Sequence, residues 1–510
     1  MYTIGYDIGS SSIKGVIFDA EAGKVLASAF APHQEMPIHA SRPGWAEQDP
    51  LMWWEHVRTV SREMIQEFRI DRSLIGAIGI AYQMHGLVLI DRARGVLRPA
   101  IIWCDSRATG IGRQAFDTIG HQRCIERLLN SPGNFTASKL RWVIEHEPEI
   151  FRRAGWFMLP GDYVALRLTD TVSTTVPGLS EGMLWDFVSK APAEFLLSEY
   201  GIPPSLIPEI VPTFGVQGVL SRSAADDLGL PVGIPVTYRA GDQPNNALSL
   251  NVLQPGEVAS TAGTSGVVYA VSGSLEADST SRVNAFAHVN HSASDPRIGI
   301  LLCINGCGIA NSWTRRLLSS GGMSYEQMNA RASEVPAGSL GLIVLPFGNG
   351  AERMLSDLDT RAQIRGLNFN THTDAHLYRA VQEGVAFSFQ YGLELLATIG
   401  IRPAILRAGN ANLFRSPIFC QTLANCTGVA IELYETDGAQ GSARGAALGA
   451  GYYKSTAEIA RGLLRKKVIE PDKNLQNQCR GLYTNWKAAL DRTLRSGPNS
   501  IIGNTLQDEA

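Results

Sequence analysis

The feature that most constrains the fold is a strand, turn and strand pattern that occurs twice in the chain. "YTIGYDIGSSSIKGVIFD" alternates β-forming residues on both sides of a Gly-Ser-Ser-Ser turn, and "VLASAF" adds a third strand after the turn at "AEAGK". Residues 256–273, "GEVASTAGTSGVVYAVSG", repeat the opening of this pattern. The sequence therefore predicts an antiparallel three-strand meander at its start and an internal structural repeat of low identity.

Each of the two turns is rich in glycine and hydroxyl residues. Backbone N–H groups and hydroxyls in a tight concave loop can hold phosphate oxygens. The alternative for either turn by itself is a plain hairpin connection. Two such turns in one chain favour phosphate as the first ligand to test.

The segments between and after these turns alternate strands with helices. Asp49 and Pro50 predict a helix start in front of an apolar stripe. "LIGAIGIAYQMHGLVLID" predicts a buried strand, a polar loop at 83–86 and a second strand, and "IIWCDSRAT" predicts another strand that ends in polar residues. The window 374–400 predicts the longest amphipathic helix. This order indicates an α/β fold with its site at the strand ends.

Composition excludes several classes of function. A length of 510 residues allows two large domains, and a net charge of -3 gives neither a basic field for nucleic acid nor an acidic tail. The seven cysteines are scattered without a CxxC pair, which suggests neither a disulfide framework nor a zinc site. The sequence shows no targeting segment and no apolar run near the roughly 20 residues that span a bilayer. We therefore expect a cytoplasmic protein without a nucleic-acid or membrane partner, and the sequence leaves a homodimer open.

Eight motifs occur in one order along the chain: "YDIGSSSIKGVIFD", "WAEQDPLMWW", "YQMHGLVLID", "AIIWCDSRA", "GNFTASKLRWVIEHEPEIF", "MLPGDYVALRLT", "TAGTSGVVYAV" and "SARGAALGAGYY". With them the chain resembles the FGGY family of carbohydrate kinases, most closely its xylulokinases, over about residues 2–455. The resemblance implies two ribonuclease H-like domains of the actin and sugar-kinase superfamily, with ATP and sugar in the interdomain cleft. We expect an N-terminal domain over 1–250, a C-terminal nucleotide-binding domain over 251–455, and a peripheral helix and loose tail over 456–510.

Asp242 in "YRAGDQPNNAL" follows an apolar run and precedes a helix. By itself it is equally consistent with a cap on a helix that begins near Pro244. The resemblance places it where the family has its catalytic base, beside the phosphoryl acceptor. An ionised carboxylate there would orient a sugar hydroxyl and accept its proton.

The resemblance also assigns the phosphate and metal ligands. Asp7, together with Asp242, is expected to hold Mg²⁺ against the phosphates of ATP; the alternative for Asp7 is a hydrogen bond within its own turn. The expected phosphate-binding residues of the two turns are Gly9, Ser10, Ser11, Ser12, Gly263, Thr264 and Ser265. Lys14 is either a further phosphate ligand or a strand-surface lysine.

A polyol needs hydrogen-bond donors and acceptors and an apolar wall. The polar loops after the strands provide candidates, and the resemblance places the Met-His pair of "QMHG" at the xylulokinase substrate site. The expected sugar-binding residues are Gln83, Met84, His85, Trp103, Asp105 and Gln243. For Trp103 a place in the core is the alternative.

The loop "RAGNANLF" lies where the family has a glycine-rich segment beside adenine, and Gly409, Asn410 and Asn412 are its candidate nucleotide contacts. "AGNA" departs from the family's commoner Gly-Gly-Gly-Ala, which leaves the register open. The motif "GDQPNN" is closer to the glycerol kinase form of the catalytic motif than to the xylulokinase form. The resemblance therefore specifies the type of reaction more closely than the identity of the substrate.

The expected function is ATP-dependent phosphorylation of a ketopentose, with D-xylulose first. Ribulose, fuculose, glycerol or another polyol is the alternative substrate. A non-catalytic sugar or nucleotide sensor is the alternative of a different class, and the intact Asp242 and the lack of a basic segment count against it. An NAD-dependent oxidoreductase is excluded because no G-x-G-x-x-G follows the first strand.

Overall fold

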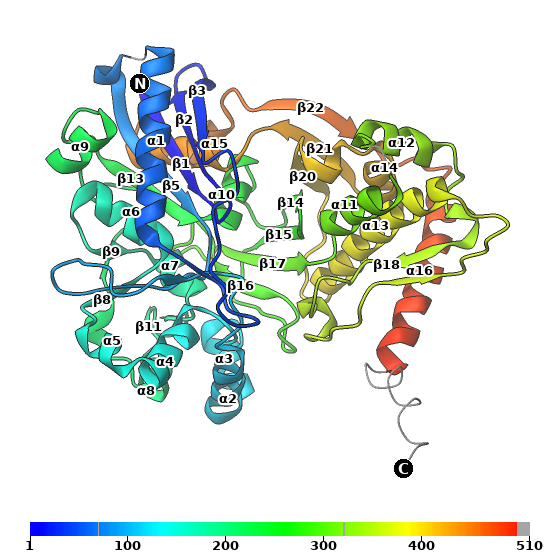
Figure 1. The fold of residues 1–510 in the computed structure, drawn as a ribbon, viewed down its shortest axis with the longest axis horizontal. Helices are drawn as coiled ribbons and strands as arrows, with labels where there is room; N and C mark the ends of the chain where they lie inside the picture. Colours follow the sequence, from blue (N-terminus) through cyan, green and yellow to red (C-terminus); the bar gives the residue numbers. More distant parts are fainter. Residues whose placement is uncertain (70, 320–321, 497–510) are drawn as a thin grey trace.

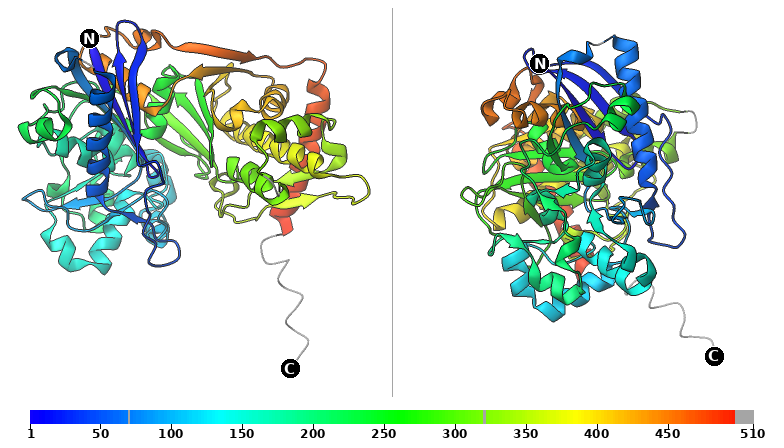
Figure 2. Two further views of the ribbon diagram at one scale, coloured as in Figure 1. Left: turned by 45° about the horizontal axis from the view of Figure 1, so that its top comes forward. Right: turned by 90° about the vertical axis from the view of Figure 1, so that its left-hand side faces the viewer.

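The computed structural model describes residues 1–69, 71–319 and 322–496. The chain forms two lobes, each built around one large β-sheet (Figure 1). Figure 2 shows the lobes joined along one side and diverging toward the other. The expected two-domain α/β fold is confirmed.

The first lobe is built on a five-stranded sheet with the order β13-β5-β1-β2-β3. Its strands are β1 (Tyr2–Ile8), β2 (Ile13–Asp19), β3 (Lys24–Ala31), β5 (Ile75–Tyr82) and β13 (Val236–Gly241). β1, β2 and β3 are antiparallel neighbours, which confirms the predicted meander. β5 and β13 are added in parallel on the other side of β1.

The second lobe is built on a seven-stranded sheet with the order β16-β17-β15-β14-β20-β21-β22. Its strands are β14 (Val258–Ala262), β15 (Gly266–Ser272), β16 (Asn284–Ala287), β17 (Ile298–Ile304), β20 (Ile405–Gly409), β21 (Ala430–Glu435) and β22 (Leu464–Ile469). β14, β15 and β17 are antiparallel neighbours, and β20 and β21 are parallel to β14. This is the arrangement of the first sheet with one extra strand at each edge, so the predicted internal repeat is confirmed.

Short strand pairs brace the loops around these sheets. They are β4 (Glu47–Gln48) with β7 (Ala100–Ile101), β6 (Val88–Ile90) with β8 (Trp156–Met158), β9 (Ser173–Thr174) with β12 (Glu209–Ile210), β10 (Trp185–Asp186) with β11 (Ala191–Pro192), and β18 (Ile343–Leu345) with β19 (Gln363–Arg365).

Helices cover both faces of the first sheet. α1 (Pro50–Phe68) starts as predicted, with Asp49 as the N-cap accepting from the Leu51 N–H, and it packs on β2 and β3. The other helices of this half are α2 (Thr109–Ile119), α3 (His121–Leu128), α4 (Thr136–His146), α5 (Pro148–Arg153), α6 (Pro160–Thr169), α7 (Val176–Glu181), α8 (Glu194–Tyr200), α9 (Arg222–Leu228) and α10 (Asp242–Ser249).

The opposite face of the first sheet is covered by α15 (Gly438–Gly449), which lies far along the sequence. A Cβ atom on Gly5 would lie 2.0 Å from the Ala439 carbonyl oxygen, and one on Gly79 would lie 2.0 Å from the Ser442 carbonyl oxygen. Gly5 and Gly79 are partners in the β1–β5 register, so the two glycines together let the helix backbone lie directly on the sheet. The expected domain over 251–455 assigned this segment to the second domain, whereas its contacts are with the first sheet.

The second lobe packs around α13 (Asp374–Thr398), the predicted long helix, which is followed by Gly400 with φ +80°. The remaining helices are α11 (Gly308–Leu318), α12 (Tyr325–Ser333), α14 (Pro417–Thr427) and α16 (Gln476–Ser496). Within the described ranges, no helix is both long and apolar enough to cross a membrane.

The segment after residue 455 contains a helix, α16, as expected, and its described part is also anchored to the second lobe. β22 completes the edge of the second sheet by pairing with β21. Trp486 of α16 is only 1% exposed and donates a hydrogen bond from Nε1 to the Val344 carbonyl oxygen at 2.8 Å. The polar composition of the segment hides this anchoring because single large side chains provide it. The expected tail over 497–510 lies outside the described residues.

Candidate active site

Two carboxylates meet where the first sheet adjoins the starts of two helices. Asp7 lies near the end of β1, and Asp242 is the first residue of α10, directly after β13. A Cβ atom on Gly438, the first residue of α15, would lie 2.4 Å from Asp7 Oδ2. Asn245 Nδ2 of α10 donates a hydrogen bond to the Gly438 carbonyl oxygen at 2.8 Å. The starts of α10 and α15 therefore converge beside Asp7, and both helix dipoles favour an anionic ligand there.

The electrostatics of this pair favour a cation or a proton between the two carboxylates. Burial raises the pKa of Asp7; the charge of Lys14 lowers it, and that of Asp437 raises it further. Burial also raises the pKa of Asp242 to about 7, with the charge of Asp7 as the second cause. In the part of the chain that the structure describes, no group of three or more His, Cys, Asp or Glu side chains is arranged to hold a metal ion. A cation at this place would have Asp7 and Asp242 as its protein ligands.

α10 begins at Asp242 rather than near Pro244, and its N-cap is Gly241. The Asp242 carboxylate lies in the first turn, where the backbone N–H groups of Asp242 and Gln243 interact with it, so the capping alternative stays open. The carboxylate also accepts a hydrogen bond from Gln243 Nε2 at 3.3 Å. The expected neighbour Gln243 therefore lies in contact with the expected base.

The first turn, Gly9 to Ser12, is held from two sides. The Gly9 N–H donates to the Ser12 carbonyl oxygen, and Gln48 Nε2 donates to the Ser10 carbonyl oxygen at 2.7 Å. Trp103 Nε1 lies 3.3 Å from Ser10 Oγ, and its side chain is 50% exposed, so Trp103 is not a core residue. Ser11 is exposed at the tip of the turn.

Lys14 is exposed and lies directly opposite Asp7 in the β1–β2 register. The expected metal ligand and the expected phosphate ligand are thus paired across two strands.

Three of the expected sugar residues form one loop beside Asp242. Gln83 and Met84 are 3% and 5% exposed, and the buried Gln83 Oε1 makes no hydrogen bond. A Cβ atom on Gly241 would lie 2.6 Å from Met84 Cγ, which puts Met84 against the residue that precedes Asp242. The structure therefore brings the loop after β5 against the end of β13, where α10 begins.

His85 has a defined tautomer. Its Nδ1 lies 3.1 Å from the Glu181 carbonyl oxygen, and because a carbonyl only accepts, Nδ1 carries the proton. Burial lowers the pKa of His85 to about 3, with the Lys139 charge as the second cause, so the ring is neutral. Nε2 is left with a lone pair that can accept a hydrogen bond from a hydroxyl.

Lys139 of α4 is a functional candidate that sequence reasoning missed. It is fully buried, and its Nζ donates to the carbonyl oxygens of His85 at 2.8 Å and Ile102 at 2.9 Å. Burial lowers the pKa of its amine to about 8. Lys139 thus ties the loop of His85 to the segment that leads to Trp103. The motif "TASKLRW" contains Lys139. A single lysine in a predicted helix does not indicate that its amine will bind two buried carbonyl oxygens.

Asp105 does not occupy the place that the sequence suggested. Its carboxylate is 0% exposed, accepts from the Ala46 N–H at 2.6 Å, and forms a forked ion pair with Arg107 at 2.7 Å. Arg107 in turn stacks 3.8 Å from the ring of Trp45. A sugar hydroxyl would have to displace these partners, so the geometry assigns Asp105 to holding the loop around Trp45.

Glu181, at the end of α7, is the second missed residue and lies beside the expected base. It is 2% exposed, and its Oε2 would lie 2.9 Å from a Cβ atom on Gly241. Burial raises the pKa of Glu181 well above its ordinary value, and the charges of Asp242 and Asp162 add to the effect. No sequence pattern marks Glu181, because its burial depends on how α7 packs against distant strands.

The second turn opens into a pocket of about 550 Å³ in the second lobe. Gly263 and Thr264 line it, and their carbonyl oxygens accept from the first N–H groups of α11 at 2.9 and 3.1 Å. Asn311 also lines the pocket; it is 5% exposed, and its Oδ1 has no hydrogen-bond partner. Sequence reasoning missed Asn311. Ser265, the last residue of the turn, is half-buried and is not part of the lining.

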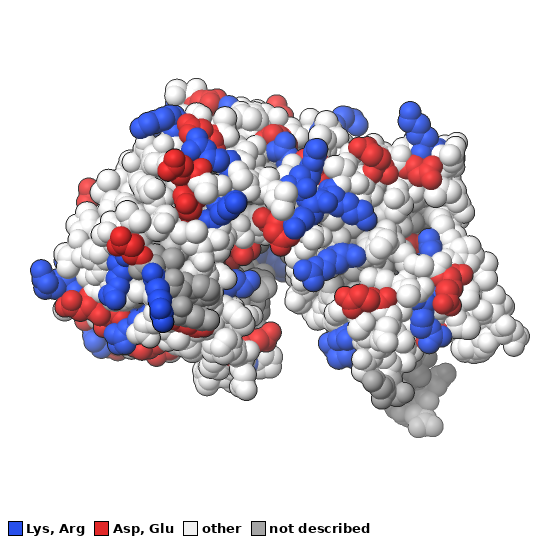
Figure 3. All heavy atoms as spheres, turned by 90° about the horizontal axis from the view of Figure 1, so that it is seen from above, with Lys and Arg blue, Asp and Glu red and all other residues white. Residues whose placement is uncertain are grey.

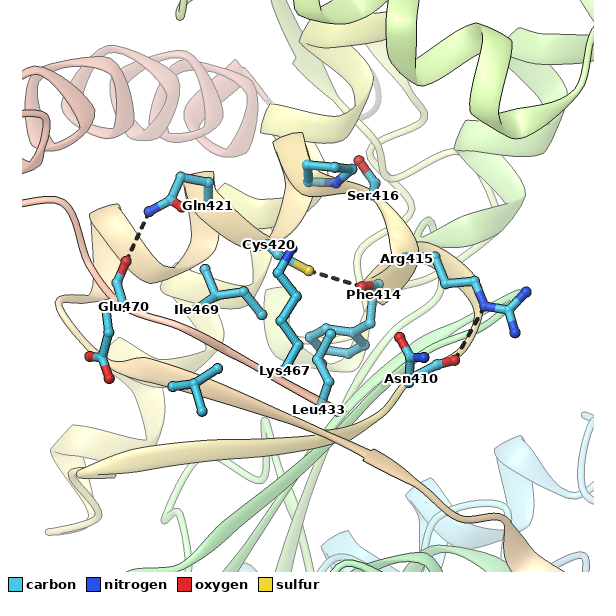
Figure 4. A pocket seen from close by; sticks show the side chains of 12 residues that line it. Asn410, Phe414, Arg415, Ser416, Cys420, Gln421, Leu433, Lys467, Ile469 and Glu470 are labelled. Carbon is cyan, nitrogen blue, oxygen red and sulfur yellow. Dashed lines mark hydrogen bonds between the residues drawn. The ribbon is translucent and has the colours of Figure 1, made fainter. Parts of the chain in front are cut away.

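The expected nucleotide loop is divided between two pockets. Asn412, with φ +52°, lines the pocket of Thr264. Asn410 instead lines a separate pocket of about 400 Å³ between α14 and β22, together with Lys467 (Figure 4). Gly409 ends β20 and lines neither pocket. Of the three expected residues, the structure brings Asn412 to the second turn and does not bring Asn410 there.

The face of the molecule seen from above carries charged side chains of both signs (Figure 3). Figure 3 shows acidic and basic side chains interspersed over both lobes, with a hollow between the lobes. This agrees with the small net charge of -3.

Comparison with solved structures defines the class of protein. The chain superposes on a xyloylose kinase from Brucella ovis with a TM-score of 0.87 and 26% identity, covering 96% of this chain and 99% of that one. A xylulose kinase from Rhodospirillum rubrum gives a TM-score of 0.85 and 27% identity, covering 97% and 99%. The fold is thus the two-lobed α/β fold of these sugar kinases.

Sequence comparison identifies the family. Residues 2–249 match the model of the FGGY family of carbohydrate kinases, N-terminal domain, and residues 258–453 match the C-terminal domain of the same family. A xylulose kinase of Bacillus subtilis (strain 168) is 28% identical over 97% of this chain and 99% of its own length. A xylulose kinase of Escherichia coli (strain K12) is 29% identical over 92% of this chain and 94% of its own length. The chain belongs to the FGGY family of carbohydrate kinases.

Proposed function

We propose that this kinase transfers the γ-phosphoryl group of ATP to a hydroxyl of a ketopentose, with D-xylulose as the first candidate. The observation that carries the proposal is the Asp7 and Asp242 pair where α10 and α15 begin beside the first sheet. The loop of Met84 and His85 lies directly against this pair through Gly241. The relatives named xylulose kinase, which cover nearly the whole chain, support the choice of sugar.

In this proposal Asp242 orients the acceptor hydroxyl and takes its proton. Since its pKa is about 7, a large fraction of the side chain is ionised at neutral pH, which suits a general base. His85 Nε2 accepts a hydrogen bond from another hydroxyl, and the exposed face of Trp103 provides an apolar wall. Met84 limits the depth of the site from the Gly241 side.

The residues present fit magnesium and a nucleotide. Mg²⁺ is commonly held by one or two carboxylates and keeps several waters, which suits Asp7 and Asp242. The pocket of about 550 Å³ with the unpaired Asn311 Oδ1 suits a nucleotide base, with Thr264 and Asn412 at its edge. When bound, Mg-ATP supplies the phosphoryl group that is transferred. Lys14 and the turns at Gly9–Ser12 and Gly263–Ser265 are the proposed phosphate contacts.

The test is a coupled assay of ADP release over the four 2-ketopentoses and a set of polyols, with Asp242→Asn beside the wild type. We expect the variant to lose roughly 10²–10⁴-fold in kcat while sugar binding persists, because a general base contributes on that scale. Asp226→Asn, at an exposed position of α9, is the matched control and should keep full activity.

Each part of the proposal has its own failing result. Equal turnover by the Asp242→Asn variant would contradict the role of Asp242. Turnover with another polyol but no ketopentose would contradict the sugar, and no sugar-dependent ADP release at all would favour a sensor. A cytoplasmic location, expected from the sequence, belongs to the proposal as well.

A further inference from the structure

Glu181 is a buried carboxylate that the mechanism above does not use. It is 2% exposed; the Tyr82 hydroxyl and the His85 N–H interact with its carboxyl group, while its Oε1 has no hydrogen-bond partner. A buried polar atom without a partner destabilises the folded protein, so its presence suggests that a ligand pairs with it. The question is which group approaches Glu181 when the site is in use.

The position of Glu181 points to the sugar. Its main chain is tied to the sugar loop, because its carbonyl oxygen accepts the hydrogen bond from His85 Nδ1 at 3.1 Å. Its carboxylate and the Met84 side chain lie against the same atom, since a Cβ on Gly241 would be 2.9 Å from Glu181 Oε2 and 2.6 Å from Met84 Cγ. Asp242 is the next residue. Glu181 therefore lies next to Met84, His85 and Asp242, the residues proposed to surround the acceptor hydroxyl.

The charges around Glu181 limit what can pair with it. Among the described residues, no lysine or arginine forms an ion pair with Glu181. The nearest cations are committed elsewhere: Arg239 pairs with Asp162 at 3.0 Å, and Lys139 Nζ donates to two carbonyl oxygens. Asp162 and Asp242 add negative charge on the same side. A buried carboxyl oxygen in these surroundings can pair with a neutral hydroxyl, whereas an anionic group of the substrate would add to the negative charge of Asp162 and Asp242.

We infer that Glu181 is a specificity-determining residue that binds one hydroxyl of the sugar through its unpaired Oε1 and selects neutral sugars over sugar acids. The inference rests on the proposed kinase function and adds the substrate class that the site accepts. Polar groups built to bind a hydroxyl discriminate strongly against analogues that lack it or present it wrongly, because the buried group is then left unpaired.

The test compares Glu181→Ala and Glu181→Gln with the wild type on the four 2-ketopentoses, 1-deoxy-D-xylulose and gluconate. The four ketopentoses differ only in the configuration of two hydroxyls. We expect Glu181→Ala to lower kcat/KM for the preferred sugar by about 10–100-fold and to change the ratios among the panel by at least about fivefold. Glu181→Gln keeps the shape and a hydrogen-bonding oxygen, and it should restore part of the ratio. The KM for ATP should stay the same in both variants.

Glu352→Gln is the matched control. Glu352 is also a buried glutamate, 0% exposed, but it lies in the second lobe and accepts from the N–H groups of Asn305 and Gly306. It should alter stability without changing the sugar ratios. A purely structural role for Glu181 predicts a uniform loss over the whole panel together with a lower unfolding midpoint, and that result would overturn the inference.

Sugar binding without nucleotide, measured by titration calorimetry on the same variants, separates this inference from the proposed function. If the wild type phosphorylates another polyol instead of a ketopentose, the proposed sugar fails, and Glu181 is judged on that polyol and its epimers. Unchanged binding of that polyol in Glu181→Ala would refute the role of Glu181.

Discussion

The two copies of the repeated sheet carry different groups at equivalent strand ends. In the first copy, β5 leads into the loop 83–86 and β13 leads into Asp242. In the second copy, β20 leads into the loop 410–412 and β21 leads into Asp437. The first set surrounds buried acidic groups. In the second set, the loop 410–412 brings Asn412 to a pocket whose edge is formed by glycine, amide and hydroxyl groups, whereas the charge of Asp437 acts on Asp7. One scaffold, used twice, thus separates the proposed reacting carboxylates from the proposed nucleotide pocket.

The two sheets also differ in how a helix is packed on them. On the first sheet, α15 lies with its backbone against Gly5 and Gly79. On the second sheet, the ring of Phe389 from α13 lies against Gly266, where a Cβ atom would be 2.8 Å from the ring. The first contact is between rigid backbones and the second uses a side chain. The first lobe therefore has little room to adjust, which suits a site whose carboxylates must keep a fixed geometry.

The largest expected effect comes from adding one methyl group at this backbone contact. Gly79→Ala would place a Cβ atom 2.0 Å from the Ser442 carbonyl oxygen, so α15 must move off the sheet, and we expect a loss of about 4 kcal/mol or more of stability. Gly266→Ala meets only side-chain atoms, the Phe389 ring and the Cys307 sulfur, and should cost about 1–3 kcal/mol. Urea unfolding of both variants measures the difference.

Gly110→Ala controls for the substitution itself, because a Cβ atom there would meet nothing within 4 Å. It should leave stability nearly unchanged. If Gly79→Ala were as stable as the Gly110→Ala variant, the close packing of α15 on the first sheet would be wrong.

A smaller effect is expected from the charge of Asp242. Burial, and then the charge of Asp7, raise the pKa of Asp242 to about 7 in the folded protein, against about 4 in an unfolded chain. The folded state therefore binds this proton more tightly than the unfolded state, and its stability falls as the pH rises from about 4 to about 7. The Asp242→Asn side chain carries no charge at any pH, so the variant avoids this loss of stability. At about pH 8 in EDTA its free energy of unfolding should exceed that of the wild type by about 2 kcal/mol. This figure is reduced because the side chain is partly exposed.

The measurement is the unfolding midpoint of both proteins at about pH 8 and about pH 4, where the difference should vanish. A difference that did not depend on pH would contradict the raised pKa. Together with the expected loss of turnover, a gain in stability would mark Asp242 as a residue kept for function at the expense of stability.

Much of this fold could be predicted from the sequence because its signals are local. The meander, the cap at Asp49, the loop 83–86 and the long helix over 374–400 all depend on alternation or on single punctuating residues. The repeat could be predicted from two glycine and hydroxyl turns. The place of α15 could not, since its packing on the first sheet depends on Gly5 and Gly79, which lie in the first hundred residues of the chain, and no local pattern records such a contact.

The candidate site shows the same limit at the level of single residues. Asp7 and Asp242 stand at strand ends and could be predicted together with the family resemblance. Asp105 stands at a strand end too, but Arg107 and Ala46 occupy its oxygens. Lys139 and Glu181 lie on helices that pack beside the site. In the sequence, a charged residue on a helix gives no sign of whether it faces solvent or a buried loop. Spacing identifies the loops, whereas tertiary packing decides which side chains face the substrate.

The smallest expected effect tests this limit in the second lobe, where two asparagines two residues apart face different pockets. Asn412 lines the pocket of Thr264, and Asn410 lines the pocket of Lys467 (Figure 4). Asn412→Gly removes the side-chain amide and introduces a residue that tolerates φ +52°. We expect the KM for ATP to rise about fivefold to tenfold while kcat is retained, because the loss of one hydrogen bond costs about 1 kcal/mol. Asn410→Gly is the matched control and should leave both constants unchanged. If Asn410→Gly raised the KM for ATP and Asn412→Gly did not, the nucleotide would lie on the Asn410 side of the loop. The residues that contact ligand in the two lobes would then not stand at equivalent positions after their strands.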